Sequence, residues 1–331
     1  MEGAKKEGKL VFASSPSPTA RIQIPEAFKK AFGVDVDYLG GPSSDLANRL
    51  RSEQAANQYT VDVTLSGSDT TYLVLYGQHM TEPLRPHLIR PDVLDPKAWR
   101  VGKVWFMDPE GQYIARASDY TSQNLWVNTD YVNADGIKSW KDLLKPEYKG
   151  KISTYDPVKN GSGAQMAAFL WTKLGADYAK SLYVDQQVAI TQDYRQLSDW
   201  TGRGTYPIEM AGRSEDHDQL KKDGFKIAPL GPFPEAPGTK SAGFGLVNLV
   251  KNPPHPNAAH LFVNWILSKD GQIAWNNSQK TVSIRTDVDN SWLTEDIVPK
   301  PGLEYFDTYD WDYTLHGYPK ANAAIKQMLG Q

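Results

Sequence analysis

A strand, a tight loop and a helix are predicted in succession within residues 151–170, KISTYDPVKNGSGAQMAAFL. The strand occupies 152–155, and Ser162 is placed to cap the helix with its hydroxyl oxygen. A helix start carries unpaired N–H groups and partial positive charge, so Ser162 and Gly163 are candidates for contacting an anion. The alternative is an ordinary capped strand-to-helix turn. Other parts of the chain are needed to decide between these interpretations.

Three further strands are each predicted to end in a loop of small residues, most of them hydroxyl-bearing. The strands at 9–13, 34–38 and 61–65 alternate with helices at 24–32 and 45–54. This alternation indicates an α/β fold with a parallel sheet, in which ligands bind outside the carboxyl ends of the strands. The loops therefore provide six candidate ligand contacts: Ser14, Ser15, Gly41, Ser66, Gly67 and Ser68. A simple turn or helix cap is the alternative for each loop.

Composition narrows the possible functions. The chain has 331 residues, enough for two domains or one discontinuous pair, and its net charge of −3 makes nucleic acid an unexpected partner. The absence of cysteine excludes disulfides, thiolate metal sites and cysteine nucleophiles, and the six histidines show no metal-binding spacing. No nucleophile elbow, phosphate loop or zinc motif is present, so we expect neither an enzyme nor a cofactor. No apolar run is long enough to span a bilayer.

Several segments together resemble one family. These are, in chain order, EGKLVFASS, LWVNTD, RGTYPIEM, HPNAAHLFVNWILSKDGQ and SIRTDV. They are similar to segments of the extracytoplasmic solute-binding proteins of ABC importers, in the ferric-iron-binding-like branch with the type II periplasmic-binding fold. The resemblance covers nearly the whole chain. Its most specific piece, HPNAAHLFVNWILSKDGQ, identifies the fold rather than the ligand.

The resemblance implies an α/β fold of two lobes with a central ligand cleft and two crossing hinge strands. We expect lobe 1 to contain 1–122 and 246–331 and lobe 2 to contain 123–245, with crossings near 123–128 and 241–247. The helix at 257–267 should pack in the lobe that contains the first strand. The implied partners are a small-molecule solute and an inner-membrane ABC permease. The expected state is a periplasmic monomer whose signal peptide is absent from this sequence.

One loop departs from the family pattern. Iron-binding members resemble one another in carrying adjacent tyrosines after the strand that matches YPIEM, whereas this chain has Ala211-Gly212-Arg213-Ser214. We therefore predict no bound metal at the usual site. Related branches bind small organic anions, phosphorylated sugars, phosphonates or thiamine-like cations, so the ligand stays open.

Arg213 is the main charged candidate, because a guanidinium can form two hydrogen bonds to a carboxylate or phosphate. The alternative is a surface arginine paired with Glu215 or Asp216. Tyr194 and Arg195 begin a predicted helix where the family often contacts ligand; the alternative is a solvated helix start.

Three more residues complete the candidate set. Tyr155 and Asp156 flank the loop in 151–170, with Asp156 favoured as a turn or hinge residue. Tyr120 is a further phenol near the first crossing. Arg285, in SIRTDV, is expected to be structural.

Three functions stay open at this point. The first is a receptor for a small anionic or polar solute that bears a carboxylate, phosphate or phosphonate. The second is an Fe(III) receptor that uses Tyr194, Tyr120 or Asp156 with a synergistic anion. The third is an enzyme on a similar fold that uses a carboxylate as acid or base.

Overall fold

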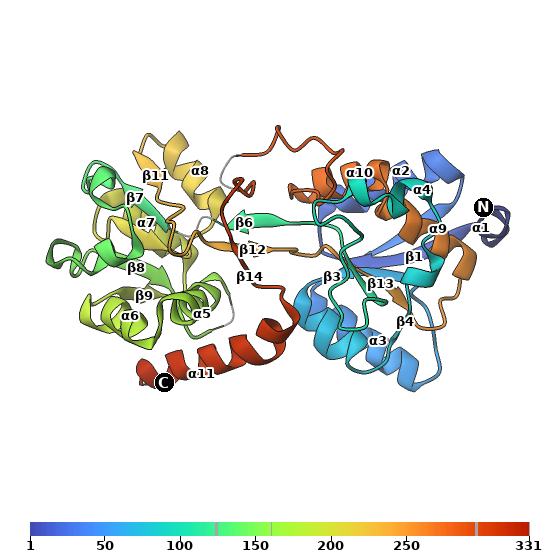
Figure 1. Cartoon of the computed structure of the whole chain (residues 1–331), viewed down its shortest axis with the longest axis horizontal. Coiled ribbons are helices and arrows are strands. Elements are labelled where there is room, and N and C mark those ends of the chain that lie inside the picture. The colour runs from blue at the N-terminus through green and yellow to red at the C-terminus, as the bar shows by residue number, and fades with distance from the viewer. Residues whose placement is uncertain (123–124, 160, 295–296, 331) are drawn as a thin grey trace. The chain divides into compact units, whose positions relative to one another are not determined.

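The computed structural model describes residues 1–122, 125–159, 161–294 and 297–330, without the side chains of residues 43–44 and 214–215. The chain forms two compact units (Figure 1). Unit 1 contains Met1–Tyr120, Ser241–Val298 and Tyr309–Trp311. Unit 2 contains Thr121–Lys240, Pro299–Thr308 and Asp312–Gln331.

Unit 1 is a sheet covered by helices. Its strands are β1 (Lys9–Ser14), β2 (Asp35–Gly40), β3 (Val63–Ser66), β4 (Thr81–Glu82), β5 (Ile114–Arg116) and β13 (Leu246–Val250). Its α-helices are α1 (Glu2–Glu7), α2 (Pro18–Phe32), α3 (Ser43–Ala55), α4 (Pro91–Leu94), α9 (Pro256–Ile266) and α10 (Lys269–Gln279). Shorter helical turns occupy Thr70–Tyr76, Arg85–His87 and Pro96–Ala98.

The order of strands in the unit 1 sheet is β2-β1-β3-β13-β4, with β5 also paired to β13. β1 is parallel to both β2 and β3, so the loops that follow Ser14, Gly40 and Ser66 leave the same edge of the sheet. The expectation that three strand-end loops lie at equivalent positions is confirmed.

Both faces of β1 are covered. Phe12 belongs to a core with α2, α9 and α10, whereas the next residue, Ala13, packs with Leu50 of α3. Figure 1 shows α2 and α10 on one side of this sheet and α3 on the other. The rings of Phe12 and Phe262 are 4.9 Å apart, so the predicted packing of the helix at 257–267 beside the first strand is confirmed.

Unit 2 has a second sheet with its own core. Its strands are β7 (Leu125–Asn128), β8 (Ile152–Tyr155), β9 (Ala189–Thr191), β10 (Ile208–Met210) and β11 (Ile227–Pro229). Its α-helices are α5 (Ser162–Leu174), α6 (Ala176–Lys180), α7 (Tyr194–Arg203), α8 (Ser214–Lys222) and α11 (Tyr318–Met328). Shorter turns occupy Ala134–Gly136, Trp140–Leu144, Pro146–Tyr148, Ser181–Asp185 and Tyr313–Gly317.

The order of strands in unit 2 is β11-β7-β10-β8-β9. β8 is parallel to β9 and β10, which brings the residues after Tyr155, Thr191 and Met210 to one edge. A small third sheet, β14-β12-β6, contains β6 (Tyr120–Ser122), β12 (Thr239–Ser241) and β14 (Phe306–Asp307). The chain passes from unit 1 to unit 2 within β6 and returns within β12.

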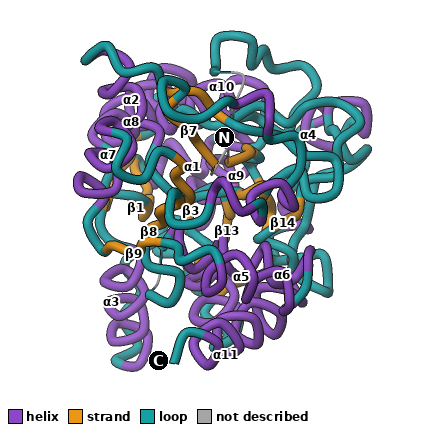
Figure 2. The backbone as a smooth tube through the Cα atoms, turned by 90° about the vertical axis from the view of Figure 1, so that its left-hand side faces the viewer, coloured by secondary structure: helices purple, strands orange, loops and turns teal. Residues whose placement is uncertain are grey.

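The lobes expected from the sequence and the observed units differ at the second crossing and in the C-terminal tail. The expectation puts 241–245 in lobe 2, but these residues belong to unit 1. It also puts all of 246–331 in lobe 1, but 299–308 and 312–331 belong to unit 2. The reason is helix α11, whose Ile325 is fully buried in the unit 2 core and which lies beside α5 (Figure 2). The first predicted crossing, 123–128, begins at two residues outside the described part of the chain. Across the described residues, no helix is long and apolar enough to cross a membrane.

Candidate functional site

Four of the predicted site residues meet at the strand-end edge of unit 2. The rings of Tyr155 and Tyr194 stack in parallel, with centroids 3.9 Å apart and planes at 5°. The guanidinium carbon of Arg213 is 4.6 Å from the centre of the Tyr194 ring, and the Tyr194 hydroxyl is 3.0 Å from Oγ of Ser162. β8, α5, α7 and the loop after β10 each supply one of these side chains.

Ser162 is not the N-cap of its helix, so that prediction is wrong. The N-cap is Gly161, and Ser162 is the first helical residue. The Ser162 hydroxyl donates to the carbonyl oxygen of Ala211 at 2.5 Å, and it can therefore accept from the Tyr194 hydroxyl. Ser162 thus connects the start of α5 to the loop that carries Arg213.

Gly163 allows α5 to begin against the end of β8. A Cβ atom at this position would overlap the carbonyl oxygens of Tyr155 and Asp156. A residue without a side chain is therefore needed at this close approach. The role of Gly163 in the site is steric.

Arg213 forms the surface pair that the sequence offered as the alternative to ligand recognition. Its Nε and Nη2 donate to the two carboxylate oxygens of Asp216 at 2.8 and 3.2 Å, as in the surface-pair alternative. The same guanidinium covers Tyr194 and has a side-chain exposure of 42%, so it is both anchored and accessible. The Glu215 side chain, the other partner considered, lies outside the described residues.

Asp156 is a turn residue, as the sequence favoured. Its Oδ1 accepts from the backbone N–H groups of Val158 and Lys159, and its Oδ2 accepts from Nε2 of Gln192. Burial alone would raise the pKa of Asp156, but these hydrogen bonds outweigh it and hold the pKa below its usual value. Arg195 is exposed, and its backbone N–H donates to Asp193, the N-cap of α7.

The strand-end loops of unit 1 are partly used within the fold. Ser14 donates to the carbonyl oxygen of Leu65, and the Ser66 hydroxyl is hydrogen-bonded to Thr71. The backbone N–H of Gly41 donates to the carbonyl oxygen of Ser14 at 3.2 Å. These groups support the sheet edge, which agrees with the turn and cap alternatives.

Ser15, Gly67 and Ser68 lie beside residues that the sequence did not single out. The Ser15 hydroxyl donates to Oε1 of Gln279 at 3.4 Å, and its carbonyl oxygen accepts from the Tyr38 hydroxyl at 2.9 Å. The Tyr309 hydroxyl donates to the carbonyl oxygen of Gly243 and is hydrogen-bonded by the backbone N–H of Ser68. A Cβ atom on Gly67 would contact this hydroxyl. Tyr38 lies in a strand that the sequence predicts, but nothing local in the sequence marks Gln279 or Tyr309 as neighbours of these loops.

Unit 1 also contains a hollow of about 240 Å³. Tyr120, Gly243, Phe244, Trp275 and Gln279 contribute to its lining. Burial raises the pKa of Tyr120, so this phenol stays protonated at neutral pH. Burial likewise raises the pKa of Tyr309. Both phenols therefore carry no charge at neutral pH.

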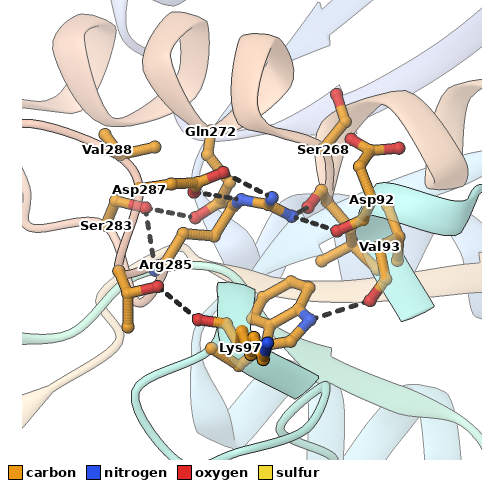
Figure 3. Close-up of polar contacts among 12 residues, drawn as sticks. Asp92, Val93, Lys97, Ser268, Gln272, Ser283, Arg285, Asp287 and Val288 are labelled. Atoms are coloured by element: carbon orange, nitrogen blue, oxygen red, sulfur yellow. Dashed lines mark hydrogen bonds and ion pairs between the residues drawn. The ribbon is translucent and has the colours of Figure 1, made fainter. Parts of the chain in front are cut away.

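Arg285 is structural, as expected (Figure 3). Its guanidinium forms a two-point ion pair with Asp287 and donates to the carbonyl oxygens of Asp92 and Leu267. The side chain is almost fully buried. Its contacts join the tail to α4 and α9, which explains its place in SIRTDV without a ligand.

No metal centre built from His, Asp or Glu is found in the described ranges. Among those residues, no group of three such side chains is placed to hold a metal ion.

Comparison with known proteins identifies the family. The profile described as "Bacterial extracellular solute-binding protein" matches residues 23–303. An uncharacterized protein of Haemophilus influenzae is 32% identical over 291 residues, which cover 82% of this chain and 77% of the relative.

Solved structures agree on the fold. Iron-bound HitA of Pseudomonas aeruginosa is 17% identical, with a TM-score of 0.61 and coverage of 97% of this chain and 99% of HitA. AfuA of Actinobacillus pleuropneumoniae, solved with fructose-6-phosphate bound, is 21% identical, with a TM-score of 0.60 and 98% coverage of both chains.

The α/β units and these likenesses define a solute-binding protein of the class that serves ABC importers, with the periplasmic-binding fold. The chain belongs to the bacterial extracellular solute-binding family. The expected fold class and family are thereby confirmed. This family consists of transport-associated binding proteins that act outside the cytoplasm.

Proposed function

We propose that this chain is the receptor for a small anionic solute, bearing a carboxylate, phosphate or phosphonate, which it delivers to an inner-membrane ABC permease. The observation that carries the proposal is Arg213, whose accessible guanidinium is fixed against Tyr194 by Asp216. Arginine suits planar, two-point recognition of such anions.

Two features near the 211–213 loop favour an anion over a cation. The Asp156 carboxylate keeps its charge, but its oxygens already accept from three N–H groups, which leaves them less available to coordinate a cation. The backbone N–H groups at the start of α5 have positive polarity.

A second candidate is Fe(III) binding, favoured by the stacked phenols of Tyr155 and Tyr194. HitA, a structural relative, was solved with iron bound. The guanidinium 4.6 Å from the Tyr194 ring would repel a trivalent cation, so we rank this candidate second. One iron per purified chain, lost on Tyr194→Phe, would reverse the ranking.

Mass spectrometry of small molecules released from the denatured protein is the direct test. Calorimetry with inorganic phosphate, methylphosphonate, citrate and fructose 6-phosphate then ranks the anionic groups. Charge-assisted hydrogen bonds contribute roughly 1.5–3 kcal/mol, so Arg213→Ala should weaken binding about ten- to a hundredfold. Arg213→Lys should recover only part of this lost affinity, because the lysine ammonium group cannot donate two parallel hydrogen bonds as the planar guanidinium can.

Arg203→Ala is the matched control, because Arg203 is an exposed arginine on the same helix, α7, where it pairs with Asp199. Its removal should leave the affinity unchanged. If Arg195→Ala weakens binding and Arg213→Ala does not, Arg195 is the residue that binds the anionic group of the solute.

The cellular setting forms part of the proposal. We place the protein in the periplasm as a monomer that acts without a cofactor and binds no nucleic acid. Its proposed role is binding rather than catalysis. Size-exclusion chromatography with light scattering tests the monomer, and fractionation of the native host tests the compartment.

A further inference from the structure

A buried ionisable pair lies directly beneath the loop that carries Arg213. Oε1 of Glu209, in β10, is 2.7 Å from Nε2 of His217, in α8, and both side chains are only 1% exposed. The other carboxylate oxygen of Glu209 lies 2.6 Å from Oγ1 of Thr201. Both oxygens of this buried carboxylate are therefore satisfied, which limits the cost of its burial.

The aromatic ring of Trp126 covers one face of the His217 ring. It stacks on the His217 ring with centroids 4.2 Å apart and planes at 22°. In the described part of the chain, Nδ1 of His217 has no hydrogen-bond partner. A neutral ring with its proton on Nε2 fits this geometry, because it donates to Glu209 and leaves no buried N–H without an acceptor.

The pair fixes the path of residues 211–213. A Cβ atom on Gly212 would overlap Oε1 of Glu209 and come within 2.9 Å of Nε2 of His217, so the loop is packed directly on the pair. Ala211 has a φ of 61°, a left-handed conformation that residues with side chains rarely adopt. The backbone N–H of His217 donates to the carbonyl oxygen of Arg213 at 3.2 Å.

We propose that Glu209 and His217 are positioning residues that hold the 211–213 loop and thereby fix Arg213 over Tyr194. This inference rests on the proposed function, because it makes the affinity for the anion depend on two side chains that do not touch it. It also explains why a strained, side-chain-bearing residue is tolerated at Ala211: strained backbone persists where surrounding contacts over-determine it.

The loop itself gives a readout that needs no ligand, because trypsin cleaves after arginine. Cleavage at the 213–214 bond, followed by mass spectrometry, should be slow in the wild type. His217→Leu should accelerate it about ten- to a hundredfold, since local opening follows the lost hydrogen bond to a charged group. His217→Gln keeps a side-chain N–H donor and should restore much of the protection. If His217→Leu fails to fold, Glu209→Gln replaces it in this proteolysis test, because glutamine has nearly the same volume as glutamate.

His255→Leu is the matched control. Nδ1 of His255 lies 2.9 Å from Oδ2 of the fully buried Asp62, so this pair in unit 1 resembles the Glu209–His217 pair. Its loss should lower overall stability without accelerating cleavage at the 213–214 bond. Equal cleavage at that bond in His217→Leu and the wild type would overturn the proposal.

Calorimetry with inorganic phosphate separates this inference from the proposed function. His217→Leu should weaken phosphate binding at least about tenfold, and adding it to Arg213→Ala should weaken binding no further, because the two act as one unit. If Arg213→Ala weakens binding but His217→Leu does not, the positioning role is overturned and the proposed function stands. If neither weakens it, both are overturned.

Discussion

At the scale of single residues, hydrogen-bond partners decide whether a carboxylate is available to bind a ligand or stabilises a turn. Asp156 receives three N–H donors and has a lowered pKa. A lowered folded-state pKa means that ionised Asp156 stabilises the protein above its ordinary pKa of about 3.9 and loses this effect as the pH falls through the folded value. Stability should therefore depend on this side chain at neutral pH.

Asp156→Asn tests that dependence. The variant should be less stable by about 1–2 kcal/mol at pH 7, because hydrogen bonds to a charged acceptor are replaced by weaker ones. In urea unfolding, the gap should shrink as the pH falls below the ordinary aspartate pKa. Asp135→Asn, at a side chain that is 90% exposed, should change little. A gap of the same size at pH 7 and at acid pH would contradict the assignment.

At the scale of elements, the junction of β8 and α5 depends on one glycine. Gly163→Ala should destabilise unit 2 by about 1–3 kcal/mol, because the new methyl group would overlap the carbonyl oxygens of Tyr155 and Asp156. The shift of α5 should also separate Ser162 from Tyr194. Gly41→Ala is the matched control, because its Cβ would meet Leu46 at an ordinary 3.8 Å. Thermal unfolding of both variants measures the loss of stability. Equal decreases in Tm would show that the β8–α5 junction can shift to accommodate the methyl group.

The sequence predicts elements where a local pattern specifies them. The strand at 152–155 is observed with those bounds, and the helix predicted at 257–267 is observed as α9 (Pro256–Ile266). Ser162 shows the limit: a serine after Asn-Gly suggests a cap, but its hydroxyl bonds to Ala211, 49 positions away. The Glu209–His217 pair was missed for a different reason, since a histidine eight positions after a glutamate has no distinctive spacing.

The C-terminal tail shows the same limit over a longer distance. Ile325 and Tyr309 both lie in the C-terminal tail, and no local sequence pattern indicates which unit each one joins. Ile325 packs in the core of unit 2, whereas Tyr309 belongs to unit 1 and reaches Gly243. Both placements come from packing between segments far apart in the chain, which local periodicity does not encode.

At the scale of the whole molecule, a receptor and an enzyme differ in the fate of the ligand. A ligand that binds only the native protein stabilises it by RT ln(1 + [L]/Kd), about 2.7 kcal/mol at a hundredfold excess over Kd. The anion released from the purified protein, added back at that excess, should therefore raise Tm by several degrees.

The same sample should return the ligand unchanged, because the described side chains around Tyr155, Ser162, Tyr194 and Arg213 include no base aimed at a nucleophile. Ser162 donates to a backbone carbonyl, and the nearby Asp156 carboxylate is taken up by amide donors. Differential scanning fluorimetry measures Tm, and mass spectrometry after overnight incubation measures the ligand. Arg213→Ala should lose about half of the shift in Tm if its Kd rises tenfold, and most of it if its Kd rises a hundredfold, at the same ligand concentration. Conversion of the ligand by the wild type, absent in heat-denatured protein, would favour an enzyme on this fold.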